Sequence, residues 1–187
     1  MTTLIPMRQA VFAEYLEAAI AGYAEDNVAA GRWPSEGALA RSRADFADSL
    51  PQGLATPKNY LYEIQDDDEH ISVGYIWFAQ VEKHGIKSAF VYDVEIKPHR
   101  RRRGHARAAL QALEPIVSGL GLANIGLHVF GHNPGAQALY RLLGYEVTGV
   151  NMLKAIRTQN SCAGVDGRAS QLNWEVPSAI HFASSVR

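Results

Sequence analysis

The stretch Tyr92-Asp-Val-Glu-Ile-Lys-Pro-His-Arg-Arg-Arg-Arg-Gly-His-Ala-Arg-Ala-Ala109 decides the fold. The alternating apolar residues Val94 and Ile96 predict a strand that ends at Pro98. The alanine-rich run after Gly104 predicts a helix. A turn rich in arginine and glycine therefore lies directly before the first turn of a helix.

This turn has the features of an anion-binding site. The first N–H groups of a helix lack intrahelical partners and carry the positive end of its dipole. Arg101, Arg102 and Arg103 add positive charge to that position. Gly104 and Ala106 keep bulky side chains away from the backbone, so that phosphate oxygens can approach it. We predict that a pyrophosphate group binds here.

The spacing Arg101-x-x-Gly104-x-Ala106 resembles the (Gln/Arg)-x-x-Gly-x-(Gly/Ala) signature of the GCN5-related N-acetyltransferases (GNATs), which hold acetyl-CoA on this loop. The order of strands and helices predicted over residues 74–154 is similar to that family. The chain as a whole also resembles the bacterial YycN-type members of the superfamily. The resemblance implies an α/β (α+β) GNAT fold, in which four helices flank a central mixed, mostly antiparallel sheet of about six to seven strands.

A second stretch, Leu139-Tyr-Arg-Leu-Leu-Gly-Tyr145, resembles the other signature of the family. Tyr140 follows Asn133 by seven residues, about two helical turns, so both residues lie on one face of the predicted helix. The resemblance implies that Asn133 contacts the pantetheine or diphosphate part of CoA and that Tyr140 lies beside the thioester sulfur. The alternative is that Asn133 only caps the helix and Tyr140 only packs in the core.

The resemblance implies that acetyl-CoA is the cosubstrate. The residues expected to bind it are Val94, Ile96, Arg101, Arg102, Arg103, Gly104, His105, Ala106, Asn133, Ala136 and Tyr140. Backbone N–H groups near Val94 and Ile96, where the superfamily splits this strand from its neighbour, could polarise the thioester carbonyl. His105 is expected to act through its backbone N–H and not through its ring.

The implied reaction is direct transfer of an acetyl group to a primary amine of a small molecule or peptide. A tyrosine hydroxyl has an ordinary pKa of about 10, and Tyr140 could protonate the departing sulfur. An alkyl ammonium must first lose a proton, and Asp93 and Glu95 are the nearest acids in sequence. They alternate along the predicted strand and so share one face. Each is a candidate general base or amine contact, and either could instead pair with an arginine.

Two helices are predicted near the start of the chain, over residues 8–30 and 37–50, from apolar residues at three- and four-residue steps. In the superfamily such helices cover the acceptor cleft. The candidate acceptor contacts are therefore Tyr23, Glu25, Asp26, Trp33 and Glu36. For Tyr23 and Trp33, packing in the core is the favoured interpretation.

The remaining predicted elements complete the sheet. Strands are predicted at residues 4–7, 59–64, 72–81, 90–96, 124–130 and 145–156, and two later helices at about 105–118 and 134–143. Pro115 should kink the first of these later helices or end it early. The strand at 145–156 is expected at an edge of the sheet, where it could pair two copies in a homodimer.

Metal binding is not favoured by the candidate ligands. The acidic run from Asp66 to Glu69 predicts a solvated hairpin turn, because adjacent side chains diverge. His128 and His132 lie where a strand passes into a loop and lack the common face that a helix would give them. We expect no metal in this protein.

The composition limits the class of protein. The chain has 187 residues, of which 47% are hydrophobic, so one well-packed α/β domain is expected. We place the GNAT domain at residues 1–157 and a disordered or loosely packed C-terminal tail at 158–187. A net charge of -1 argues against general attraction to nucleic acid or an acidic membrane. The single Cys162, and the lack of a signal peptide or apolar span, predict a cytoplasmic protein.

Three functional interpretations follow from these residues. The first is an acetyl-CoA-dependent N-acetyltransferase. The second is a CoA-binding sensor or regulatory module without turnover, against which the presence of Tyr140 argues. The third treats the arginines at 100–103 as a nucleic-acid patch, which is weak without interleaved aromatic residues or a wider basic surface.

Overall fold

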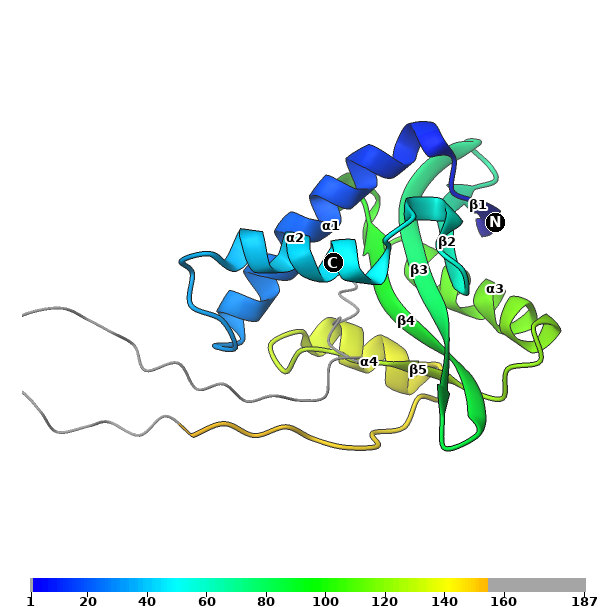
Figure 1. The fold of residues 1–187 in the computed structure, drawn as a ribbon. Coiled ribbons are helices and arrows are strands. Elements are labelled where there is room, and N and C mark those ends of the chain that lie inside the picture. The colour runs from blue at the N-terminus through cyan, green and yellow to red at the C-terminus, as the bar shows by residue number, and fades with distance from the viewer. Residues whose placement is uncertain (1, 155–187) are drawn as a thin grey trace, which may run out of the picture.

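The structure, a computed structural model, describes residues 2–154 (Figure 1). The predicted domain boundary after residue 157 and the predicted tail lie outside these residues. Two short 3₁₀ turns, η1 (Gly53–Ala55) and η2 (Pro98–Arg100), accompany the helices and strands. In chain order the helices and strands are β1 (Thr2–Pro6), α1 (Gln9–Ala29), α2 (Ala38–Ser49), β2 (Asn59–Asp66), β3 (Ile71–Lys83), β4 (Ile86–Ile96), α3 (His105–Gly119), β5 (Ile125–Leu127) and α4 (Pro134–Leu142).

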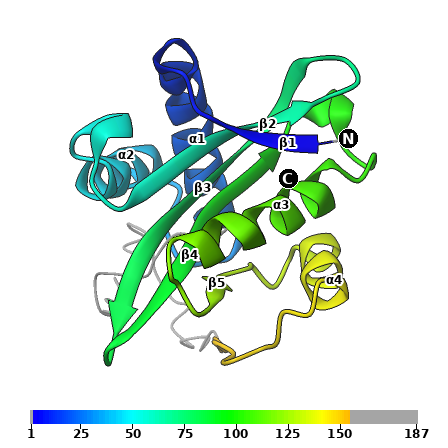
Figure 2. The ribbon, with the colours of Figure 1, turned by 90° about the vertical axis from the view of Figure 1, so that its right-hand side faces the viewer.

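A mixed sheet forms the centre of the fold. Its five strands lie in the order β1-β2-β3-β4-β5. The first four pair antiparallel, and β5 pairs parallel to β4. Helices α1 and α2 cover one face of the sheet, and α3 and α4 lie on the other side (Figures 1 and 2). The predicted mixed, mostly antiparallel sheet with four helices is confirmed.

Strand β3 is buried on both faces, as its apolar sequence predicted. Tyr75 and Trp77 join the core cluster beneath α1 and α2. Ile76 and Phe78 join the second cluster, beneath α3 and α4. The alternation follows from the two-residue period of a strand. Each layer of helices therefore has its own apolar core.

The strand predicted at 145–156 is wrong over residues 145–154, which form no strand. The sheet has five strands in the described part of the chain, fewer than the predicted six to seven. Apolar residues of this segment face solvent, with Val150 75% and Met152 93% exposed. The strand predicted at 124–130 is also shorter, at Ile125–Leu127. Residues 145–154 therefore offer no strand edge through which two copies could pair.

Helix α3 continues through Pro115 to Gly119, so it does not end early at the proline. Pro115 lies on the exposed side of the helix, while Leu113 and Val117 on either side of it are buried against the sheet. Packing of this apolar face compensates for the one backbone hydrogen bond that proline removes. Among residues 2–154, no helix has the combination of length and apolarity that crossing a bilayer requires.

An ion pair fastens the start of α1 to β2. Arg8 donates to the Glu63 carboxylate from Nε at 2.8 Å and from Nη2 at 2.9 Å. Its backbone N–H donates to the same carboxylate at 3.2 Å. Glu63 is fully buried, and the hydrogen bonds from Arg8 lower the pKa of its carboxyl. This contact fixes the helix layer that lies over the carboxylates of β4.

Glu63→Gln is expected to lower the free energy of unfolding by about 1.5–3 kcal/mol at neutral pH, the usual contribution of hydrogen bonds to a charged group. A carboxyl with a lowered folded-state pKa adds stability above its unfolded pKa of about 4.3 and loses it as the pH falls through the folded value. The difference in melting temperature between the wild type and Glu63→Gln should therefore be largest above about pH 5 and shrink below about pH 4. A difference that stays constant into acid would contradict this role.

Candidate active site

A bulge and a split shape the second half of β4. Trp77 pairs with Asp93 and Phe78 pairs with Val91, so Tyr92 is an extra residue in β4. Strand β5 pairs with β4 only as far as Val91, whereas β4 continues to Ile96. A bulge bends a strand and turns its side chains. Beyond the bulge, the two strands are no longer joined.

The open edge of β4 carries backbone N–H groups. The Lys97 N–H donates to the Val73 carbonyl at 2.9 Å and therefore points toward β3. Successive amides of a strand point in opposite directions, so the Ile96 N–H points away from β3. The same alternation directs the Val94 N–H to the open edge. These are the two amides that the sequence predicted as donors to a carbonyl.

Helix α3 begins where β4 ends, after a tight turn. Gly104 precedes the helix in the left-handed conformation, with a φ of 89°. The first bond of the helix runs from the Ala108 N–H to the Gly104 carbonyl at 3.0 Å. The N–H groups of His105, Ala106 and Arg107 precede it and point out of the helix end. A side chain built at Gly104 would meet nothing within 4 Å, so the backbone is open to a ligand.

The arginines of the turn do different things. Arg101 Nε donates to the Ile96 carbonyl at 2.9 Å and so braces the end of β4. Arg102 is exposed and left-handed, with a φ of 62°. Arg103 is exposed, and its Nη1 lies 3.9 Å from Glu69 Oε1. Arg102 and Arg103 thus have the accessible guanidinium groups beside Gly104.

The hairpin turn predicted between β2 and β3 is present at residues 67–70, and Asp68 and Glu69 in it are exposed, but not all of its carboxylates are simply solvated. Asp66 is buried, with 8% of its surface exposed. Glu69 accepts hydrogen bonds from Arg100 Nη1 at 2.6 and 2.7 Å. Arg100 is therefore paired and is not merely a solvated charge. The contact also leaves the arginine run less positive than its sequence indicates, which argues against a nucleic-acid patch.

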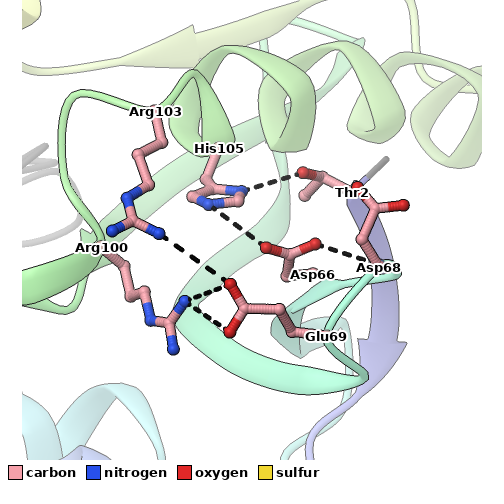
Figure 3. A network of polar contacts seen from close by, with 7 residues as sticks. All are labelled: Thr2, Asp66, Asp68, Glu69, Arg100, Arg103 and His105. Atoms are coloured by element: carbon pink, nitrogen blue, oxygen red, sulfur yellow. Dashed lines mark hydrogen bonds and ion pairs between the residues drawn. The ribbon is translucent and has the colours of Figure 1, made fainter.

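The ring of His105 makes contacts that the sequence does not predict, since only its backbone N–H is expected to act on the cosubstrate. The residue is buried, and its Nδ1 lies 3.1 Å from Thr2 Oγ1. Its Nε2 lies 3.8 Å from Asp66 Oδ2 (Figure 3). The ring thus joins the first residue of α3 to β1 and to the hairpin. An open pocket of about 350 Å³ lies here, lined by Thr2, Asp66, Asp68, Arg103, Gly104, His105 and Ala108.

Asp93 and Glu95 lie on one face of the sheet, as predicted. Their partners on β3, Trp77 and Tyr75, belong to the core beneath α1 and α2. Burial raises the pKa of the Tyr15 hydroxyl well above its ordinary value, and the charges of Asp93 and Glu95 raise it further. Tyr15, on α1, is therefore neutral and lies near both carboxylates. The sequence identified it only as an apolar position of a helix.

Helix α4 carries the second predicted group of residues. The Ala136 N–H donates to Asn133 Oδ1 at 3.0 Å, which confirms Asn133 as the N-cap. Ala136 and Tyr140 are buried in the core shared with β4 and α3. The Tyr140 ring lies 5.5 Å from the ring of Tyr145. The structural roles of the cap and the packed aromatic are thus present, and their contacts with CoA remain predictions.

The connection after α1 contacts the loop that precedes α4. Arg32 Nη2 lies 2.8 Å from His128 Nε2, and its guanidinium lies over the ring of Phe130 at 4.9 Å. His132 Nε2 lies 3.6 Å from Asp26 Oδ1. These contacts join the early helices to the chain that follows β5.

Two of the candidate acceptor contacts pack in the core. The rings of Tyr23 and Trp33 meet edge to face at 5.2 Å, and Trp33 packs against the core beneath α1 and α2. This agrees with the favoured interpretation of both residues. Within residues 2–154, no three His, Cys, Asp or Glu side chains gather in a way that could hold a metal ion.

The arrangement suits a thioester carrier with a diphosphate. Gly104 leaves the amides at the start of α3 accessible, and Arg102 and Arg103 lie beside them. The open edge of β4 leads from the turn before α3 toward the bulge at Tyr92. Asp93 and Glu95 belong to the same strand and lie on its face beneath α1 and α2. A carrier held along the edge would bring its acyl end close to acids that could accept a proton.

Comparison with known proteins identifies relatives of the same kind. The acetyltransferase (GNAT) family model matches residues 17–145. YycN of Bacillus subtilis (strain 168), an uncharacterized N-acetyltransferase, is 37% identical over 153 residues, or 82% of this chain and 97% of YycN. YdgE, another uncharacterized N-acetyltransferase of that strain, is 29% identical over 154 residues, which are 82% of this chain and 98% of YdgE.

The fold agrees with these matches. The crystal structure of Bacillus subtilis YycN is similar to this chain with a TM-score of 0.79 and 35% identity. The match covers 84% of this chain and 100% of the YycN chain. The family model spans well over half of the sequence and includes both signatures. The chain therefore belongs to the GNAT family of N-acetyltransferases.

Proposed function

We propose that this N-acetyltransferase transfers the acetyl group of acetyl-CoA to a primary amine of a small molecule or peptide. The observation that carries the proposal is the left-handed, open Gly104 at the start of α3, directly after the split strand β4. A helix start of this kind binds phosphate through its backbone. Acetyl-CoA, when bound, supplies an acetyl group activated as a thioester.

The residues of two elements would hold the cosubstrate. Arg102, Arg103 and the amides of Gly104, His105 and Ala106 would bind the diphosphate, with Arg101 supporting the turn from the Ile96 carbonyl. The amides of Val94 and Ile96 would donate hydrogen bonds along the open edge of β4. On α4, Asn133 and Ala136 would contact the cosubstrate from the side opposite the open edge of β4.

One carboxylate and one tyrosine hydroxyl would move protons. Asp93 or Glu95 would accept the proton that an alkyl ammonium must lose before its nitrogen can attack. The Tyr140 hydroxyl would donate a proton to the departing sulfur, and the amide groups of β4 would stabilise negative charge on the carbonyl oxygen. Tyr15 lies near both carboxylates and is neutral, so it would orient them without adding charge.

A screen of amines tests the proposal. The full chain is incubated with acetyl-CoA and polyamines, aminoglycosides, amino acids or peptides with free N-termini, and the released thiol is measured. We expect release that depends on one class of amine. The carboxylates on the face beneath α1 and α2 favour a cationic acceptor. Acetyl-CoA binding without release by any amine would instead favour the second candidate, a CoA-binding sensor without turnover.

Asp93→Asn is expected to lower kcat/KM for the amine by about tenfold or more near pH 7, because the ammonium must then lose its proton to solvent. Activity should recover as the pH rises toward the pKa of the free amine, about 10. The pH dependence of kcat/KM, measured also for Glu95→Gln, assigns the base to one carboxylate. Full activity at neutral pH in both variants would contradict a role for either acid.

A further inference from the structure

A polar network ties the hairpin between β2 and β3 to the turn before α3 (Figure 3). The Glu69 carboxylate accepts from Arg100 Nη1 at 2.6 and 2.7 Å, and Arg103 Nη1 lies 3.9 Å away. The Arg100 side chain is 18% exposed and that of Glu69 is 48% exposed. The pair of Glu69 and Arg100 is therefore partly shielded from water. A charged hydrogen bond is stronger when it is shielded in this way.

A second group of contacts lies beside the first. His105, the first residue of α3, lies between Thr2 of β1 and Asp66 at the end of β2. Asp66 Oδ1 also accepts from the Asp68 N–H at 3.1 Å, which shapes the hairpin that presents Glu69. The hairpin is thus held in place against α3. These contacts lie in the same hairpin that carries the Glu69 carboxylate to the arginine turn.

The position of Glu69 matters because its carboxylate contacts arginines on both sides of a strained stretch of backbone. Arg102 has a φ of 62°, a left-handed conformation that is costly for a residue with a side chain. Glu69 contacts Arg100 and Arg103, the residues on either side of this strained stretch. Four consecutive arginines also repel one another, and one carboxylate between two of them reduces that repulsion. Glu69 therefore stabilises the turn in the form that exposes the amides of α3.

We propose that Glu69 is a positioning residue for CoA: by pairing with Arg100 it holds the turn before α3 in its binding form before the ligand arrives. A turn ordered in advance loses less conformational entropy on binding, so affinity is higher. Arg103, which is 3.9 Å from Glu69 and 55% exposed, stays available to phosphate. The inference rests on the proposed function, since it concerns affinity for the same cosubstrate.

Calorimetric titration with CoA tests the proposal without requiring turnover. Glu69→Gln should raise the Kd for CoA about fivefold, as expected for a partly shielded charged pair. The double variant Glu69→Gln with Arg100→Gln should bind no more weakly than Arg100→Gln alone, because both remove one interaction. Hydrogen exchange of the amides at 102–106, measured without ligand, should be faster in Glu69→Gln. In turnover, the KM for acetyl-CoA should rise while kcat stays unchanged.

Glu17→Gln is the matched control. It removes another two-point pair, in which Arg43 donates to Glu17 at 2.7 and 2.8 Å on the surface of α1 and α2. Its Kd for CoA should equal that of the wild type. An unchanged or lower Kd in Glu69→Gln would overturn the proposal, and a lower one would mean that Glu69 only competes with phosphate. A wild-type chain that gives no heat with CoA would overturn the proposed function itself.

Discussion

Gly104→Val is expected to weaken acetyl-CoA binding by about 100-fold or more while the chain still folds. Gly104 has a φ of 89°, which a β-branched residue adopts only with strain. Its side chain would also occupy the open space through which phosphate oxygens reach the amides of α3. Both effects raise the Kd, and a tenfold change corresponds to about 1.4 kcal/mol. Titration calorimetry with acetyl-CoA measures the change.

Gly121→Val separates strain from ligand contact. Gly121 follows the other end of α3 and has a φ of 71°, and a side chain added there would likewise meet nothing within 4 Å. The two variants should therefore lower the melting temperature to a similar degree, but Gly121→Val should keep the wild-type Kd. Binding by Gly104→Val within a few-fold of the wild type would rule out Gly104 as the place where phosphate approaches the backbone.

Tyr140→Phe is expected to lower kcat by about 100-fold to 10,000-fold, the usual contribution of a positioned general acid. The ring that packs in the core between α4 and β4 is retained, so this packing should be preserved. The Kd for acetyl-CoA should also stay close to that of the wild type, because only the hydroxyl is removed. Steady-state thiol release and calorimetry together separate an effect on chemistry from an effect on binding.

Tyr145→Phe is the control for this variant. Tyr145 lies 5.5 Å from Tyr140, ring to ring, and burial raises the pKa of its hydroxyl to about 12. Removing this second hydroxyl should leave kcat unchanged. If Tyr140→Phe retained full kcat, the residue would be a packed aromatic only, and another proton donor would be required.

Most of the fold could be predicted from local patterns. The helices α1, α2, α3 and α4 and the strands β2 and β3 begin and end close to the predicted residues, because apolar periodicity, prolines and glycines mark them. Strand β4 ends as predicted but begins four residues earlier, at Ile86 instead of residue 90. The segment at 145–154 has a strand-like composition, but no strand among residues 2–154 pairs with it. A strand forms only where a partner offers its backbone, and this cannot be predicted from local sequence.

Those parts of the candidate site that lie within a single segment of the chain could be predicted from the sequence. Asp93 and Glu95 share a face because alternation along β4 places them there, and Gly104 is open because a glycine precedes a helix. The contacts of Glu69 with Arg100 and of His105 with Thr2 join residues 31 and 103 positions apart. Such pairs depend on how the hairpin and β1 pack against α3, and no short pattern contains that information.

The most direct test of the diphosphate site is to titrate the full chain with acetyl-CoA and, separately, with S-acetylpantetheine, which carries the same thioester but lacks the diphosphate and the adenosine 3′-phosphate attached to it. If the amides and arginines before α3 provide most of the affinity, acetyl-CoA will bind with measurable heat and S-acetylpantetheine at least about 100-fold more weakly. Equal affinity for the two thioesters, or no heat with acetyl-CoA, would contradict this assignment.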